Sequence, residues 1–193
     1  PPGVEGAPAA RAEGIGGARA GAGAREEVAF EGCRSTPWPL LDALPFASDV
    51  YARDLDYRKY NSPYCRYPYV SLYTGRGCPA HCTFCLWPQV TTGHAYRTRS
   101  AENVLAECAG LGRRFPEMQE LFFDDDTFTA DPARAREIAR GLGRLGITWS
   151  TNARANVDRA TLAALKDNGL RLFVVGYQSG VEQILKNVRK GGS

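Results

Sequence analysis

Hydrophobic and polar positions alternate between two spacings from about residue 69 onward. Four short apolar runs have the character of β-strands: "YVSLYTG" (69–75), "ELFF" (120–123), "ITWS" (147–150) and "LRLFVVG" (170–176). Four stretches carry apolar residues at helical spacing: 101–114, 132–145, 158–168 and 181–188. Strands and helices therefore alternate strictly, which predicts an α/β fold with a parallel sheet and helices outside it.

Two of the expected helices begin at recognisable capping residues. Ser100 precedes the apolar pattern of 101–114, and Asp131 precedes that of 132–145. Both side chains can accept a hydrogen bond from a free backbone N–H of the first helical turn. Pro132 adds a residue that is favoured at the first helical position. These signals predict where the helices start.

The chain divides into three segments by composition. Residues 1–36 are rich in Gly, Ala, Pro and Arg and almost lack large apolar side chains, so we expect them to be disordered. Residues 37–68 are rich in Pro, Tyr and Asp and predict an irregular lead-in. Residues 69–193 carry the alternating pattern and form the predicted domain.

Charge and hydropathy exclude several classes of protein. The net charge of +3 comes from interleaved acidic and basic residues, which does not indicate a nucleic-acid-binding protein. No apolar run is long enough to form a transmembrane segment, and the N-terminus lacks the features of a signal peptide. We therefore expect a cytoplasmic protein, in which clustered cysteines are more often metal ligands than disulfides.

Polar or glycine-rich residues follow every predicted strand. These segments are "TGRGC", "DDDTF", "TNAR" and "GYQSG". The carboxyl ends of parallel strands form the active face of α/β proteins. Strand ends are often polar for no functional reason, but three consecutive aspartates repel one another and favour a site that uses them.

Three cysteines lie within eight residues, at Cys78, Cys82 and Cys85. A structural zinc site needs four ligands, and His94 is a better candidate than His81 for a fourth. A ferredoxin-type cluster lacks its fourth cysteine nearby. A cubane cluster bound by three thiolates leaves one iron open, as open metal positions do in catalytic sites.

The segment "CPAHCTFC" resembles the CxxxCxφC signature of the radical S-adenosylmethionine (SAM) superfamily, with Phe84 at the aromatic position. The resemblance implies a [4Fe-4S] cluster on Cys78, Cys82 and Cys85, with SAM bound to the open iron. It also implies a (βα)6 barrel. Four of the six βα units are present, so we expect a partial parallel radical SAM barrel in a truncated chain.

The resemblance also suggests residues that contact SAM. Asp125 and Asp126 stand where the family holds the methionyl amino group, although Gly-Gly-Glu is more usual there. The segment "STNAR" offers Ser150, Asn152 and Arg154. The Arg154 guanidinium has the geometry to pair with the SAM carboxylate through two hydrogen bonds.

The last strand-end segment, "GYQSG", resembles a Gly-x-Glu-Ser-Gly pattern that contacts the SAM ribose. Gln178 replaces the glutamate and Ser179 follows it. An amide keeps the hydrogen-bonding capacity but loses the charge, which predicts weaker SAM binding. Phe84 is expected near the adenine. The residues suggested for the substrate side are Trp87, Tyr96 and Arg97, and no catalytic residue is identified.

Longer segments, such as "FFDDDTFTAD" and "FVVGYQSG", resemble the cobalamin-associated branch of the radical SAM superfamily, in particular the proteins associated with hopanoid biosynthesis. That branch usually has an upstream cobalamin-binding domain. Here the first predicted strand begins at residue 69, and the only histidines, His81 and His94, do not form a D-x-H-x-x-G motif. We therefore predict that this chain binds no cobalamin.

The expected function is a radical SAM enzyme, or its N-terminal catalytic part. It would cleave SAM reductively, abstract hydrogen from a substrate and act in the tailoring of hopanoid side chains. The expected partners are an external one-electron reductant of the flavodoxin or ferredoxin type and a small-molecule or lipid substrate. A hopanoid substrate would place the protein at the membrane surface. The alternative is a non-catalytic metal-binding fragment with zinc or a decayed cluster site.

Overall fold

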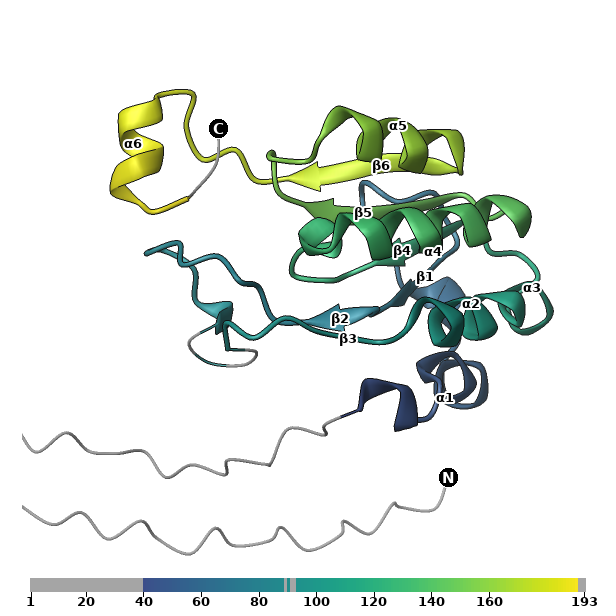
Figure 1. The fold of residues 1–193 in the computed structure, drawn as a ribbon. Coiled ribbons are helices and arrows are strands. Elements are labelled where there is room, and N and C mark those ends of the chain that lie inside the picture. Colours follow the sequence, from purple (N-terminus) through teal and green to yellow (C-terminus); the bar gives the residue numbers. More distant parts are fainter. Residues whose placement is uncertain (1–39, 89, 91–92, 191–193) are drawn as a thin grey trace, which may run out of the picture. The chain divides into compact units, whose positions relative to one another are not determined.

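Four parallel strands form one sheet in the order β1-β4-β5-β6 (Figure 1). Their bounds are Tyr69–Leu72, Glu120–Phe123, Trp149–Ala153 and Leu170–Val175. This computed structural model describes residues 40–88, 90 and 93–190, which all belong to one unit, Trp38–Ser193. The predicted four-stranded parallel sheet is confirmed, whereas the segment predicted to be disordered, 1–36, lies outside the described residues.

Helices connect successive strands and lie together on one face of the sheet (Figure 1). They are α2 (Ala101–Ala109), α3 (Leu111–Arg114), α4 (Pro132–Arg144) and α5 (Arg159–Asp167), and α6 (Glu182–Asn187) follows the last strand. The two predicted caps are confirmed. Asn103 N donates to Ser100 Oγ at 3.1 Å, and Arg134 N donates to Asp131 Oδ1 at 3.1 Å. No helix in the described ranges is long and apolar enough to cross a membrane.

The first predicted strand, 69–75, is divided in the structure. β1 ends at Leu72, and Gly75–Arg76 forms β2, which pairs antiparallel with β3 (Arg97–Thr98) in a separate two-stranded ribbon. The cause lies at Thr74, whose N–H bonds a side chain, Asp125 Oδ1, at 2.6 Å. The backbone therefore leaves the parallel sheet at this point and enters the ribbon.

The core lies between the sheet and its helices. Leu121 and Phe123 of β4 point into it, together with Phe128 of the 3₁₀ turn Phe128–Ala130 and Trp149 of β5. The rings of Phe123, Phe128 and Trp149 pack with centroids 5.4–5.8 Å apart. These three rings, all fully buried, give a rigid base to the carboxyl ends of β4 and β5.

The lead-in segment contains the helix α1 (Ala47–Asp54) and two 3₁₀ turns, Leu41–Ala43 and Tyr57–Lys59. Ala47, Tyr51 and Tyr57 of this segment pack against the core, and buried polar contacts also attach it to the domain. The fully buried carboxylate of Glu107 on α2 accepts from Ser48 N at 2.9 Å and from Arg99 Nη1 at 2.6 Å. A charge that is buried in this way needs such partners to offset the loss of hydration.

The end of the lead-in covers part of the sheet face away from the helices (Figure 1). Tyr64 packs edge-on against Phe122, whose neighbours in β4 point to the opposite face. The fully buried Glu120 accepts two hydrogen bonds from Arg171 of β6, both at 2.9 Å, and one from Arg66 N at 2.6 Å. Glu120 therefore joins the lead-in to both a central and an outer strand.

Three consecutive aspartates after β4 hold the segment that leaves β1. Asp124 Oδ2 accepts from the Tyr73 hydroxyl at 3.0 Å. Asp125 accepts from both the N–H and the hydroxyl of Thr74, and Asp126 Oδ2 accepts from Gly77 N at 2.9 Å. The three carboxylates thus bind residues 73, 74 and 77 in order, just before Cys78.

Replacing Glu120 by alanine should destabilise the fold strongly. The change leaves the Arg171 guanidinium and Arg66 N–H without their acceptor, and the loss of one partner of a buried ion pair costs about 3–5 kcal/mol. Urea unfolding followed by circular dichroism measures this free energy. Glu182→Ala is the control, because its ion pair with Lys186 is exposed and is worth at most about 1 kcal/mol. Equal losses in the two variants would contradict the assignment.

Stability should also depend on pH through Asp125. Burial raises the pKa of Asp125 to about 6, against the opposing effects of Thr74 and Arg134. The folded chain therefore keeps this proton between about pH 4 and 6, where the unfolded chain has lost it, and stability falls as the pH rises through that interval.

Asp125→Asn should remove this pH dependence because the amide does not titrate. Relative to the variant, the wild type should lose about 2–3 kcal/mol of unfolding free energy between pH 4 and 7. Urea unfolding at several pH values measures the difference. Asp167→Asn, at an exposed position on α5, is the control that should keep the wild-type slope. A wild-type slope in Asp125→Asn would show that another group is responsible.

Candidate functional site

A cavity of about 650 Å³ opens at the carboxyl ends of the strands. Its lining comes from the residue after β1, the β2–β3 ribbon and its loop, the ends of β5 and β6, the segments that follow β4, β5 and β6, and Lys190 after α6. The lining residues are Tyr73, Arg76, Cys78, Cys82, Phe84, Cys85, Trp87, Pro88, Arg97, Asp124, Asp125, Asp126, Asn152, Ala153, Arg154, Val174, Gly176 and Lys190. The volume lies within the range of about 300–1,000 Å³ that is typical of small-molecule sites.

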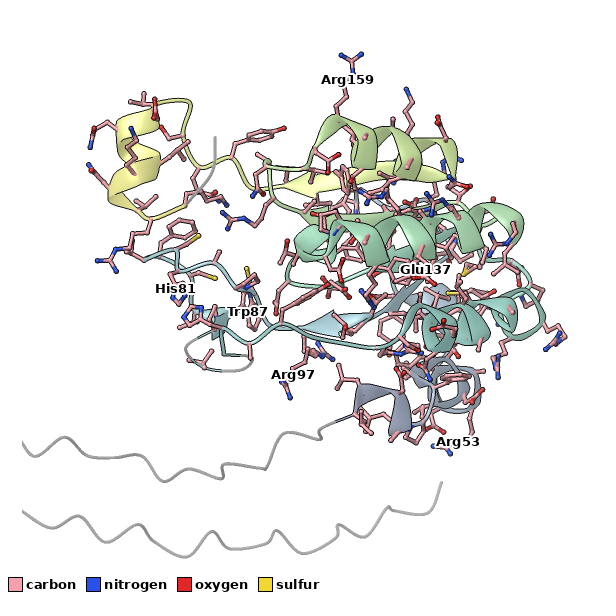
Figure 2. All side chains as sticks on the ribbon, in the orientation of Figure 1. Arg53, His81, Trp87, Arg97, Glu137 and Arg159 are labelled. Carbon is pink, nitrogen blue, oxygen red and sulfur yellow. The ribbon has the colours of Figure 1, made fainter. Side chains whose placement is uncertain are left out.

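All three cysteines of the predicted cluster line this cavity and are partly buried. Their loop joins β2 to β3, and Figure 2 shows His81 and Trp87 on it, with Arg97 at its base. Cys85 N donates to Cys82 O at 3.1 Å in a turn that keeps these two residues close. Within residues 40–88, 90 and 93–190, no three His, Cys, Asp or Glu side chains are arranged to hold a metal ion.

Gly77 determines the path of the chain into the cysteine loop. Its φ of +92° is a backbone conformation that other residues rarely adopt, and a Cβ would lie 2.2 Å from Ala95 O. Its N–H also bonds Asp126. A side chain at this position would therefore separate the two arms of the loop just before Cys78.

Burial and a nearby positive charge shift the pKa of the Cys78 thiol in opposite directions. Burial raises the pKa of the Cys78 thiol, and the positive charge of Arg154 opposes that shift. Arg154 Nη1 lies 3.6 Å from Cys82 Sγ, and its Nη2 donates to Lys190 O. A guanidinium beside thiols favours the thiolate, which is the form that binds metals.

The segment after α6 lies against the cysteine loop. Thr83 N donates to Val188 O at 3.0 Å, and Lys190 Nζ lies 5.7 Å from the centre of the Phe84 ring. Phe84 is half exposed and faces the cavity. Its predicted contact with adenine stays a prediction, as do the other SAM contacts.

Only some of the other residues predicted to contact SAM line the cavity. Asp125 and Asp126 line the cavity but also bind the chain before Cys78. Ser150 is fully buried on β5, and the cavity lining includes neither it nor Gln178 and Ser179. Gln178 is exposed with a φ of +58°, and the cavity is reached instead by Gly176.

The histidines and the suggested substrate residues also differ in position. His81 and His94 stack on each other with ring centres 3.9 Å apart, and neither lines the cavity. Trp87 and Arg97 line it. Tyr96 does not line it: this residue is partly buried, and its hydroxyl donates to Phe128 O at 3.4 Å. Burial raises the pKa of Tyr96 to about 12.

Sequence reasoning missed a polar network across the cavity wall. Asp124 accepts from the Tyr73 hydroxyl and from Asn152 Nδ2, both at 3.0 Å. The Arg76 guanidinium lies 3.5 Å from the centre of the Tyr73 ring. Burial, followed by the bond to Asp124, raises the pKa of Tyr73, which therefore stays a hydrogen-bond donor. The signals in the sequence were the first aspartate of "DDD" and the arginine of "GRGC".

The residues fit an iron–sulfur cofactor in type, and all three cysteines line one cavity, although their side chains do not converge on one metal position within the described residues. Thiolates are soft ligands that suit iron–sulfur clusters and zinc. The three thiols face one cavity that also contains the carboxylates and Arg154, so a ligand of the cluster would meet polar groups from β4 and β5. Cys78, Cys82 and Cys85 are the residues that would hold the cluster.

Comparisons with known proteins identify the family of this chain. The family model of the Radical SAM superfamily matches residues 72–193. The chain is 32% identical over 161 residues to a cytidylyl-2-hydroxyethylphosphonate methyltransferase of Streptomyces wedmorensis, covering 78% of this chain and 29% of that protein. It is 31% identical over 158 residues to an uncharacterized methyltransferase of Pyrococcus horikoshii, covering 80% of this chain and 31% of that protein.

The chain thus spans less than a third of the length of these curated relatives. The family match covers β4, β5 and β6 as well as the cysteine loop, and more than half of the chain. The chain belongs to the radical SAM superfamily of enzymes.

Proposed function

We propose that this chain carries the SAM-cleaving part of a radical SAM enzyme. The observation that supports the proposal is the single cavity at the strand ends, which Cys78, Cys82 and Cys85 line together with Arg154 and the aspartates. When bound, a reduced [4Fe-4S] cluster would supply the electron that cleaves a carbon–sulfur bond of SAM. The cleavage yields methionine and a 5′-deoxyadenosyl radical, and this radical would take a hydrogen atom from the substrate.

The side chains of the protein would bind SAM, hold the cysteine loop in position and shield the reactive species from water. Arg154 offers a guanidinium that can bind the SAM carboxylate, once its present contact with Lys190 O is exchanged. Asp126 and Asp125 hold the chain that leads into Cys78. Phe84 and Trp87 border the cavity with apolar rings, which would limit the access of water to a reactive species.

Two finer assignments differ in what supports them. The segments "FFDDDTFTAD" and "FVVGYQSG", which resemble radical SAM proteins associated with hopanoid biosynthesis, favour the tailoring of hopanoid side chains at the membrane surface. Both curated relatives are named as methyltransferases, which favours methyl transfer from SAM as a second candidate. The complete (βα)6 barrel, the external one-electron reductant and the absence of cobalamin remain predictions.

Anaerobic reconstitution with iron and sulfide tests the main proposal. We expect about four irons and four sulfides per chain and, with SAM and dithionite, the release of 5′-deoxyadenosine measured by chromatography. Cys82→Ala should lose most of the iron because one of three ligands is missing, whereas Cys108→Ala, in the core and away from the cavity, should keep it. Stoichiometric zinc without SAM cleavage would instead support the non-catalytic alternative.

The products of SAM distinguish the two finer assignments. Hydrogen abstraction yields 5′-deoxyadenosine and methionine, whereas methyl transfer also yields S-adenosylhomocysteine. Incubation of the reconstituted chain with a bacterial hopanoid extract, followed by mass spectrometry, should show a rearranged side chain if the hopanoid assignment is right. A mass increase of one methyl group together with S-adenosylhomocysteine would support the methyltransferase assignment in its place.

A further inference from the structure

The ribbon at the base of the cysteine loop places two arginines side by side. Arg76 of β2 and Arg97 of β3 are direct partners in the antiparallel register, so their side chains leave the same face of the ribbon. Both line the cavity, and Figure 2 shows Arg97 at the base of the loop that carries Trp87. Like charges that face each other across a strand pair destabilise it unless something offsets their repulsion.

No carboxylate offsets these two charges within the part of the chain that the structure describes. The ion pairs there involve other arginines, namely Arg53, Arg58, Arg99, Arg114 and Arg171, and two lysines. The aspartates of the cavity are bound elsewhere: Asp124 accepts from Tyr73 and Asn152, and Asp126 accepts from Gly77 N. The pair therefore keeps its positive charge toward the cavity.

The position of Arg76 is constrained before any ligand binds. Its guanidinium stacks on the Tyr73 ring at 3.5 Å, and Tyr73 is in turn fixed by its bond to Asp124. Stacking leaves the edge of the guanidinium, with its N–H groups, available to an acceptor. A side chain held in this way loses less entropy on binding a ligand than a mobile arginine would.

The other two cations of the cavity are used by the cysteine loop. Arg154 contacts Cys82 Sγ and Lys190 O, and Lys190 lies over the Phe84 ring. Arg154 is also the residue proposed above for the SAM carboxylate. Arg76 and Arg97 are thus two cations that the SAM-cleaving role does not use.

We propose that Arg76 and Arg97 bind a phosphate group of the substrate. This inference rests on the proposed function, because it assigns a substrate class to the same cavity. Two guanidinium groups match the double negative charge and the oxygens of a phosphate monoester, to which arginine binds through paired hydrogen bonds. A carboxylate would neutralise only one of the two charges.

Binding of small anions tests the proposal on the full chain, without cluster, SAM or reductant. Isothermal titration in a low-salt buffer should show that inorganic phosphate and glycerol 3-phosphate bind at least about tenfold more tightly than acetate. Binding should weaken as salt is added, because the interaction is between charges. Equal affinities for phosphate and acetate, or no phosphate binding at all, would overturn the proposal.

Variants locate the binding. Arg97→Gln and Arg76→Gln should each weaken phosphate binding about tenfold or more, because each removes a charge-assisted pair of hydrogen bonds. Arg97→Lys should fall between the wild type and Arg97→Gln, since it keeps the charge but loses the planar fork. Arg159→Gln is the matched control, because Arg159 is exposed on α5 and points away from the domain (Figure 2).

Two further measurements distinguish the loss of phosphate binding from misfolding and from the loss of SAM cleavage. Circular dichroism checks that each variant is folded, and Arg97→Lys serves if a glutamine variant is not. Phenylglyoxal modification followed by mass spectrometry should show that phosphate protects residues 76 and 97 but not Arg159. Wild-type affinity in both Arg97 variants, or protection at neither position, would refute the site. Failure to release 5′-deoxyadenosine in the separate assay would refute the proposed function alone.

Discussion

The arrangement of the site depends on the hydrogen bonds between the three aspartates after β4 and the chain that leaves β1. These bonds stop the parallel sheet at Leu72, turn the backbone into the β2–β3 ribbon and fix the start of the cysteine loop. Three adjacent carboxylates would repel one another in water. Here each has its own donors, and one of them is fully buried, so the repulsion is offset by local hydrogen bonds.

This arrangement gives the aspartates a structural role in addition to the predicted contact with SAM, which stays a prediction. The family resemblance suggested Asp125 and Asp126 as contacts of the SAM amino group. They do line the cavity, but the oxygens of Asp125 are already bound by Thr74, and Asp126 binds the N–H of the residue before Cys78. Their influence on the thiols is therefore exerted through the position of the loop, whatever they contact in addition.

Much of the fold could be predicted from the sequence because the signals are local. Apolar spacing indicated all four parallel strands and the helices between them, and Ser100 and Asp131 marked two helix starts that the structure confirms. The end of β1 was misplaced because it depends on Thr74 meeting Asp125, which is distant in sequence. Likewise, the three cysteines were visible as a motif, whereas the Tyr73–Asp124–Asn152 network and the Arg76–Arg97 pair require long-range geometry.

The strand β4 joins the core to the site with no spacer between them. Phe123 packs on Trp149 in the core, and the next residue, Asp124, already faces the cavity. Because successive residues of a strand point to opposite faces, a shift of one residue in this strand would exchange its inward and outward side chains. An insertion or deletion inside β4 should therefore disrupt the fold far more than one in a surface loop. The structure therefore constrains the length of this strand more strictly than that of the loops around the site.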